Sequence, residues 1–283
     1  EHEALALLSS DYAHLISSIE YHLLANHLLA NLKALIFFEV FFPNKHSTQR
    51  LKIWKKEYLH QPKEQILEDG GHYELSPMYH NIILEDLIDL RNILLEDRDF
   101  IDPIDQTIMR MLKWSKYLAY VSTGLPVFFH DSCGGVSRNY TDLLEYAENS
   151  NIEVDKKSIN KRAFHVKHFR NSGYIYAKNK YFIVRLNCSS IACTYNPGHF
   201  HSSNLTYDVE SFNEQIFVSS GLSTYAESQE RYMERSDYYH PSITQNKQNH
   251  SQIWKSFRMG KNPKLSYSFK TEESMLKVEG NFK

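Results

Sequence analysis

Two histidines separated by one residue, His199 and His201, are the side chains of this sequence best suited to chemistry. They follow Pro197 and Gly198, which favour a turn, so the backbone that leaves the turn is expected to be extended. In an extended segment residues i and i+2 point to the same side. The two imidazoles could then hold a metal ion, or one could move a proton while the other is tied down. The alternative is two solvated loop histidines, because this spacing recurs by chance in a chain with 15 histidines.

Three other segments combine polar and aromatic side chains. Asn26 and His27 interrupt a leucine-rich segment, so this pair either caps neighbouring backbone or faces a cavity. Residues 69–80 place histidines, an acid and tyrosines between two predicted helices, where Tyr79 could exchange a proton or simply pack. Residues 231–254 include His240, which either completes a metal site with His201 or packs against the strands.

The composition is that of a globular protein. Of its 283 residues 42% are hydrophobic and 23% charged, and the net charge of −2 gives no electrostatic footprint for nucleic acid. The 19 tyrosines suit sugar faces, although core packing explains most such residues. The longest apolar run, residues 34–42, is too short to span a bilayer. The three cysteines form no disulfide framework, which leaves either a Cys188–Cys193 bridge or free buried thiols.

The first half of the chain is predicted to be helical. Apolar residues recur at helical spacing after Asp11, and the pattern continues as one helix to Phe42, where Pro43 stops it. Further helices are predicted over residues 50–67, with a break near Pro62, and over residues 79–95, 103–121 and 140–149. Successive antiparallel helix pairs indicate an α/α array.

The second half is predicted to be built from strands. A polar stretch over residues 150–162 marks the boundary, and residues 174–177 and 181–186 have the pattern of a hairpin. Other strands are predicted over residues 205–209, 215–219, 253–258 and 265–269, and such numerous short strands indicate a sandwich of antiparallel sheets. We therefore predict an α+β protein of two domains, helical over residues 1–162 and a β-sandwich over residues 163–283.

Six stretches, taken in chain order, resemble the heparinase II/III family of polysaccharide lyases, which is related to alginate and oligoalginate lyases. They are residues 26–31, 69–80, 129–136, 198–205, 219–225, and 236–240 running into 251–258. The resemblance implies an incomplete (α/α) toroid followed by a β-sandwich, in agreement with the pattern above. The family architecture is longer than this chain, so we expect helices before Glu1 and strands after Lys283.

The resemblance also implies cleavage of a uronic-acid-containing glycan by β-elimination. This reaction removes the proton α to the uronate carboxylate and expels the 4-O-linked sugar, so the carboxylate charge must be neutralised. Asn26 and His27 match the neutralising positions, and Tyr79 and His199 match the acid/base pair. Neighbours would have to lower the pKa of the tyrosine, near 10, for it to act as a base. Substrate binding is assigned to His72, Tyr73, Glu74 and Arg235.

His201 and His240 match positions that hold a structural zinc in some relatives, and no other cofactor is expected. The third zinc position falls at Ser219, and serine is a poor zinc ligand. Ser203 also replaces the acid that usually orients a neighbouring imidazole in the family. A zinc site would need a substitute ligand such as Asp208 or Asp237.

The expected partner is an acidic polysaccharide or oligosaccharide, with no nucleic acid and no membrane insertion. No signal peptide is visible, and a glycan substrate favours a periplasmic or secreted protein of bacterial origin. One alternative is a non-catalytic glycan-binding protein in capsule or exopolysaccharide metabolism. Another is a zinc hydrolase that uses His199, His201 and His240. The substrate, endo or exo action and the oligomeric state are left open.

Overall fold

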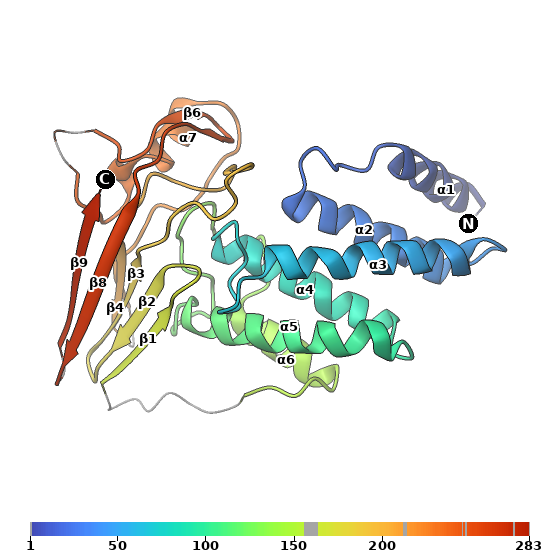
Figure 1. Cartoon of the computed structure of the whole chain (residues 1–283), viewed down its shortest axis with the longest axis horizontal. Helices are drawn as coiled ribbons and strands as arrows, with labels where there is room; N and C mark the ends of the chain where they lie inside the picture. The colour runs from blue at the N-terminus through green and yellow to red at the C-terminus, as the bar shows by residue number, and fades with distance from the viewer. Residues whose placement is uncertain are drawn as a thin grey trace.

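A computed structural model describes residues 2–155, 164–211, 214–244, 246, 248–273 and 275–282 of the chain. Helices make up the N-terminal half and antiparallel strands most of the C-terminal half, and the two parts lie side by side (Figure 1). The predicted mixture of a helical part followed by a β part is confirmed. The toroid, the sandwich and the boundary at residue 162 stay predictions. No helix within the described ranges is both long and apolar enough to cross a bilayer.

Six helices form the first part. They are α1 (His2–Ser17), α2 (Ala25–Phe41), α3 (Ser47–Gln65), α4 (Pro77–Ile93), α5 (Arg98–Tyr117) and α6 (Tyr140–Asn149). Helix α2 has apolar residues on all sides because it packs against both α3 and α4, with Leu28, Leu32 and Ile36 fully buried. As α2 to α5 alternate in direction, the N-termini of α2 and α4 both point toward the strands (Figure 1).

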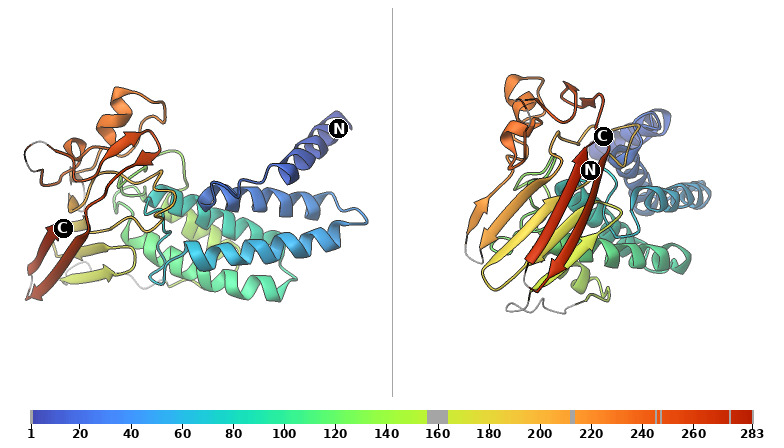
Figure 2. Two further views of the ribbon diagram at one scale, coloured as in Figure 1. Left: turned by 45° about the horizontal axis from the view of Figure 1, so that its top comes forward. Right: turned by 60° about the vertical axis from the view of Figure 1, so that its left-hand side comes forward.

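The prediction of one continuous helix from Asp11 to Phe42 is wrong. The chain leaves the helix after Ser17 and re-enters it at Ala25, so α1 and α2 are separate helices (Figure 2). Leu24 and Ala25 have positive φ angles of 57° and 50°, which an α-helix does not allow. Asn26 and His27 therefore lie in the first turn of α2 and not in the middle of a long helix. Helical periodicity could not reveal this break because apolar spacing continues through it.

The other helix predictions are confirmed with shifted ends. Ser76 caps α4 by accepting a hydrogen bond from the Tyr79 amide, so α4 begins two residues earlier than predicted. Asp97 caps α5, which therefore begins before Pro103. Helix α3 continues past Pro62 to Gln65, and the predicted break there is absent.

The main sheet has five antiparallel strands in the order β1-β2-β3-β4-β5. The strands are β1 (His165–Phe169), β2 (Tyr174–Lys178), β3 (Phe182–Asn187), β4 (Thr206–Ser211) and β5 (Gln215–Phe217). The predicted hairpin is β2 and β3, in which Tyr176 pairs with Arg185. Strand β1 was not predicted, and neither was the short helix α7 (Gln229–Glu234) that follows the sheet.

Two further hairpins complete the β part. Strands β6 (Ile253–Lys255) and β7 (Arg258–Met259) form one, and β8 (Leu265–Glu272) and β9 (Met275–Phe282) form the other. A one-turn 3-10 helix, η1 (Asp237–Tyr239), precedes them. The β8–β9 hairpin crosses the face of the main sheet that points away from the helices (Figure 2), and His168 of β1 hydrogen-bonds Tyr267 of β8 at 2.7 Å.

The two parts share a hydrophobic core. Trp114 at the end of α5 packs edge-on against Tyr174 and Phe169 of the sheet, with ring centroids 5.6 and 6.3 Å away. Phe129 stacks on Tyr174 from the connection between α5 and α6. This junction holds the helical ends close to the loops of the sheet, where the predicted site residues lie. The three cysteines are free thiols, so the bridge between Cys188 and Cys193 is absent.

Candidate functional site

Tyr79 and His199, which are far apart in the sequence, stack face to face. Their ring centroids are 3.7 Å apart and the ring planes differ by 25°. Tyr79 lies in the first turn of α4, and His199 lies in the connection between β3 and β4. The shared location that the sequence predicts for these two residues is therefore present in the structure.

A hydrogen-bonded connection between α4 and the loop at residues 130–132 sets the position of Tyr79. The Ser76 hydroxyl donates to the Asp131 carbonyl at 2.6 Å and accepts from the Tyr79 amide at 3.2 Å. The Met78 amide donates to the Ser132 hydroxyl at 3.1 Å. The Asp131 amide in turn donates to the His199 carbonyl at 3.1 Å. The helix start, the loop and the histidine segment are thus joined through buried polar groups.

Asp131 is the fully buried acid at the centre of the site. Its carboxylate contacts His199 Nδ1 at 2.9 Å and His201 Nε2 at 2.6 Å, so both imidazoles reach the same acid, as expected for residues on one face. Arg231 donates two hydrogen bonds to it, at 2.5 and 2.8 Å. Burial alone would raise the pKa of Asp131, but the hydrogen bonds from His199, His201 and Arg231 outweigh it and hold that pKa well below its usual range.

Glu74 is a second buried acid, and it faces His199 from the other side. Its Oε1 lies 3.8 Å from His199 Nε2, and its Oε2 lies 3.8 Å from His72 Nδ1. Neither oxygen has a hydrogen-bond partner within the described part of the chain. Burial raises the pKa of Glu74 to about 7, with His199 and the Asn26 backbone amide opposing the shift and Asp131 adding to it. Glu74 therefore gains and loses its proton near neutral pH.

Strained backbone surrounds these residues. Leu24 and Ala25, directly before Asn26, have positive φ, as do Leu75 directly after Glu74 and His130 directly before Asp131. None of the four is glycine, and each such conformation costs on the order of 1–3 kcal/mol. Strain of this kind persists where the surrounding structure holds it and is concentrated at functional sites.

Tyr225 is a site residue that the sequence did not single out. Its hydroxyl lies 2.8 Å from the Tyr79 hydroxyl in an exposed position. Gly221 positions its loop with a φ of +67°, where an added Cβ would meet the Ser132 carbonyl oxygen at 2.2 Å. Burial raises the pKa of Tyr79 to about 12, although the hydrogen bond from Tyr225 opposes the shift. Tyr79 therefore keeps its proton at neutral pH and suits a proton donor more than a base.

Asp131 and Arg231 were also missed as site residues. Asp131 lies within the family-like stretch at residues 129–136, but nothing in its neighbours marks it as buried beside two histidines. Arg231 begins a segment that was singled out for His240 and Arg235. Only the tertiary contacts assign both residues to the site.

His201 and His240, the predicted zinc ligands, contact each other. His201 Nδ1 lies 3.2 Å from His240 Nε2, while His201 Nε2 is bonded to Asp131. Both nitrogens of His201 are therefore engaged. Among the described residues no three His, Cys, Asp or Glu side chains converge on a common point that could hold a metal. This donor set does not fit a zinc ion, since a structural zinc takes four ligands in a tetrahedron.

The remaining predicted residues lie around this centre. The Asn26 Oδ1 atom is buried without a partner, whereas the half-exposed His27 lies 3.4 Å from Glu20. The Tyr73 hydroxyl contacts Tyr195 at 2.6 Å. His72 contacts Gln65 through Nε2 at 3.1 Å, and the described hydrogen bonds of the Arg235 guanidinium all go to backbone carbonyls. The binding roles of these residues stay predictions.

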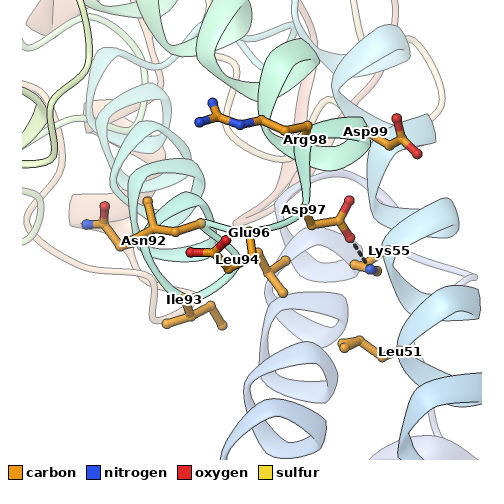
Figure 3. A pocket seen from close by; sticks show the side chains of 10 residues that line it. Leu51, Lys55, Asn92, Ile93, Leu94, Glu96, Asp97, Arg98 and Asp99 are labelled. Atoms are coloured by element: carbon orange, nitrogen blue, oxygen red, sulfur yellow. Dashed lines mark hydrogen bonds and ion pairs between the residues drawn. The ribbon is translucent and has the colours of Figure 1, made fainter.

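The space beside the site is small. Tyr73, Glu74, His199 and neighbouring residues line a cavity of about 10 Å³, which holds about one water molecule. His199 is only 6% exposed, whereas the Tyr79 and Tyr225 hydroxyls lie in an exposed position. A larger hollow of about 710 Å³ lies at the turn between α4 and α5, where Lys55 pairs with Asp97 (Figure 3). It contains none of the predicted site residues.

Comparisons with known proteins identify the family. The family model described as "Heparinase II/III N-terminus" matches residues 4–154, and the model "Heparinase II/III-like, C-terminal" matches residues 161–280. A search of curated proteins finds no match.

Solved structures share the fold. A structure of heparinase III matches with a TM-score of 0.73 and 18% identity, over 95% of this chain and 44% of that one. Heparan sulfate lyase HepC from Pedobacter heparinus matches with a TM-score of 0.63 and 17% identity, over 99% of this chain and 47% of that one. The chain therefore spans less than half the length of these structures. Since the two family models together match most of its residues, the chain belongs to the heparinase II/III family.

Proposed function

We propose that this protein is a polysaccharide lyase that cleaves a uronic-acid-containing glycan by β-elimination. The observation that carries the proposal is the stack of Tyr79 on His199, with the Tyr79 hydroxyl at an exposed edge and the histidine behind it. This arrangement places a proton donor and a proton acceptor side by side where a sugar ring could reach the donor.

Tyr79 and His199 would divide the proton transfers between them. Because the pKa of Tyr79 rises to about 12, its phenol is the donor to the leaving 4-oxygen. His199, whose Nδ1 faces Asp131, would accept the proton α to the uronate carboxylate at Nε2. The C4–O bond then breaks and a C4–C5 double bond forms in the uronate. The phenol proton moves to the leaving oxygen, so the protons balance.

The first turn of α2 would neutralise the uronate carboxylate. Helix N-termini attract anions through their free amides, and α2 begins without a side-chain cap. Asn26 lies in this turn, and the Nδ2 group of its side chain would donate to the carboxylate. His27 is the second residue proposed to neutralise the carboxylate, although in the structure its Nδ1 lies 3.4 Å from the Glu20 carboxylate. Because the pKa of Glu74 is near 7, its carboxyl can be neutral when an anionic sugar binds.

The proposed substrate is an acidic polysaccharide or oligosaccharide. One structural neighbour, HepC from Pedobacter heparinus, is named as a heparan sulfate lyase, so heparan sulfate is the first glycan to test. The reaction needs only a uronate with a 4-linked leaving group, so alginate and bacterial capsular uronates are candidates on the same grounds. Action on such polymers is consistent with a periplasmic or secreted location.

The test is the appearance of the unsaturated uronate, which absorbs in the ultraviolet. The full-length protein is incubated with heparan sulfate, alginate and a capsular uronate, with a neutral glucan as the control that cannot undergo the reaction. A rise in absorbance with at least one uronate and none with the glucan is expected. No rise with any uronate, together with measurable glycan binding, would instead support the non-catalytic binding protein.

A further inference from the structure

Asp131 accepts hydrogen bonds from His199, His201 and Arg231. Its negative charge determines which ring nitrogen of each histidine carries the proton. The guanidinium of Arg231 donates two of these bonds from Nη1 and Nη2. A carboxylate paired with a guanidinium in this way is ionised and can only accept. His199, at 2.9 Å, must therefore donate from Nδ1, and His201, at 2.6 Å, must donate from Nε2.

The tautomer of His199 follows from this bond. With the proton on Nδ1, a neutral His199 has its lone pair on Nε2, the nitrogen that faces Glu74 at 3.8 Å. The opposite tautomer would place two acceptors, Nδ1 and the Asp131 carboxylate, 2.9 Å apart inside the protein, which is strongly unfavourable. The buried acid therefore fixes both the orientation and the protonation pattern of the ring.

We propose that Asp131, held in place by Arg231, is a positioning residue that keeps His199 in the tautomer whose Nε2 can accept a proton. The inference rests on the proposed lyase function for its catalytic consequence. The predicted tautomer of His199 does not depend on that function, because the hydrogen bonds to Asp131 are present whatever reaction the protein catalyses.

Two features of the structure support a positioning role. Asp131 and Arg231 are almost completely buried, at 0% and 1% exposed, so they act on His199 and not on a ligand in solvent. The backbone of Asp131 is also bonded to the His199 carbonyl and to the Ser76 hydroxyl. A shift of Asp131 would therefore change the placement of His199 and Tyr79 together.

The direct test is the tautomer of His199 in the wild-type protein. In protein labelled with ¹⁵N-histidine, long-range ¹H–¹⁵N correlation spectra distinguish a protonated from a bare ring nitrogen. Signals of His199 are assigned by their loss in His199→Gln. We expect a protonated Nδ1 and a bare Nε2 in the neutral ring. A neutral ring protonated on Nε2 would overturn the proposal, whether or not the protein is a lyase.

The catalytic consequence is tested with Asp131→Asn, which keeps the shape but can donate through its amide. We expect kcat to fall by about 10²-fold or more while KM changes by less than about threefold, because the ring loses its orienting charge. Asp105→Asn, which removes the acid of the Arg91–Asp105 pair elsewhere, is the matched control and should leave kcat unchanged. A folded Asp131→Asn protein with kcat within about threefold of wild type would contradict the proposal.

The outcomes separate the two claims. If the wild type cleaves no glycan, the proposed lyase function is wrong, and the role of Asp131 is then judged only from the tautomer of His199 in the wild-type spectrum. If Asp131→Asn does not fold, the wild-type spectrum again decides it.

Discussion

The imidazole of His199 is enclosed by groups of different character. Tyr79 covers one face of the ring, the ionised Asp131 contacts Nδ1, and Glu74, which is close to its titration point, faces Nε2. Because the ring is 6% exposed, these three neighbours and not bulk water determine its chemistry. The hydroxyl of Tyr79, which lies in an exposed position, is the more accessible member of the pair.

Removal of the Tyr79 hydroxyl tests the role of this residue. Tyr79→Phe keeps the ring stacked on His199 but removes the proton donor, so we expect kcat to fall by about 10²-fold or more with little change in stability. The measurement is the initial rate of ultraviolet absorbance on the best uronate substrate. Tyr181→Phe, at an exposed tyrosine next to β3, is the control and should keep the wild-type rate. Activity of Tyr79→Phe within a few-fold of wild type would remove Tyr79 from the reaction.

The raised pKa of Glu74 predicts a pH-dependent stability. Its pKa is about 7 in the folded protein and near 4.5 when exposed, so the folded state binds the proton more tightly. The stability that comes from this difference is complete below pH 4.5 and is lost as the pH rises through 7. We expect the unfolding free energy of the wild type, relative to Glu74→Gln, to fall by about 2–3 kcal/mol between pH 5 and pH 8.

Urea unfolding at the two pH values measures this difference. Glu153→Gln, at an exposed acid in the segment after α6, should show the same pH dependence as the wild type. Equal changes for Glu74→Gln and the wild type would mean that Glu74 titrates like an exposed acid.

At the scale of elements, the site is assembled from connections and helix starts. The first turns of α2 and α4 supply Asn26 and Tyr79, and the loops before α6 and between β3 and β4 supply Asp131 and His199. Such segments need anchoring, and Arg185 of β3 provides an anchor between the sheet and the end of α5. Its buried guanidinium donates to the carbonyls of Tyr117 and Ala119 and pairs with Glu210 at 2.5 Å.

Replacement of Arg185 should therefore weaken the joint between the helices and the sheet. Arg185→Met leaves Glu210 and Asp208 buried without their cation, and we expect a loss of about 3–5 kcal/mol of unfolding free energy in urea titrations. Lys277→Ala removes the cation of the exposed Lys277–Glu279 pair and should have no measurable effect. A loss below about 1 kcal/mol for Arg185→Met would show that the buried acids find other partners.

At the scale of the whole molecule, the helical and β parts are expected to unfold together because one core lies between them. Trp114 is fully buried there, donates to the Ser172 hydroxyl at 3.0 Å and packs on His80 and Tyr174. The site lies beside this core, so its geometry depends on the two parts staying docked.

Truncation of Trp114 tests this dependence. Trp114→Ala should lower the unfolding free energy by about 3–5 kcal/mol while the transition stays single. Circular dichroism at helix-sensitive and strand-sensitive wavelengths should report the same midpoint. Trp254→Ala, at a tryptophan that is 65% exposed, is the control and should change stability by less than about 0.5 kcal/mol. Two separate transitions in the wild type would show that the parts are independent.

The sequence determined the order of the elements and the residue types of the site. Periodicity identified α4, α5, α6 and the β2–β3 hairpin, since each has an apolar pattern long enough to specify its own structure. The stretches around Asn26, Tyr79 and His199 indicated the heparinase II/III family, which the family models confirm. The sequence did not predict the break between α1 and α2, because the positive φ angles of Leu24 and Ala25 do not change the spacing of apolar residues.

Only the tertiary structure decided how the site is held together. The resemblance implies that Ser203 replaces an orienting acid, and the sequence did not single out Asp131 in that role. The structure brings Asp131, with Arg231 bound to it, to His199 from positions far away in the chain, and it directs His201 to His240 and Asp131. Local patterns report the conformation of neighbours along the chain. Contacts between distant buried charges depend on how whole elements pack, which no short stretch of sequence encodes.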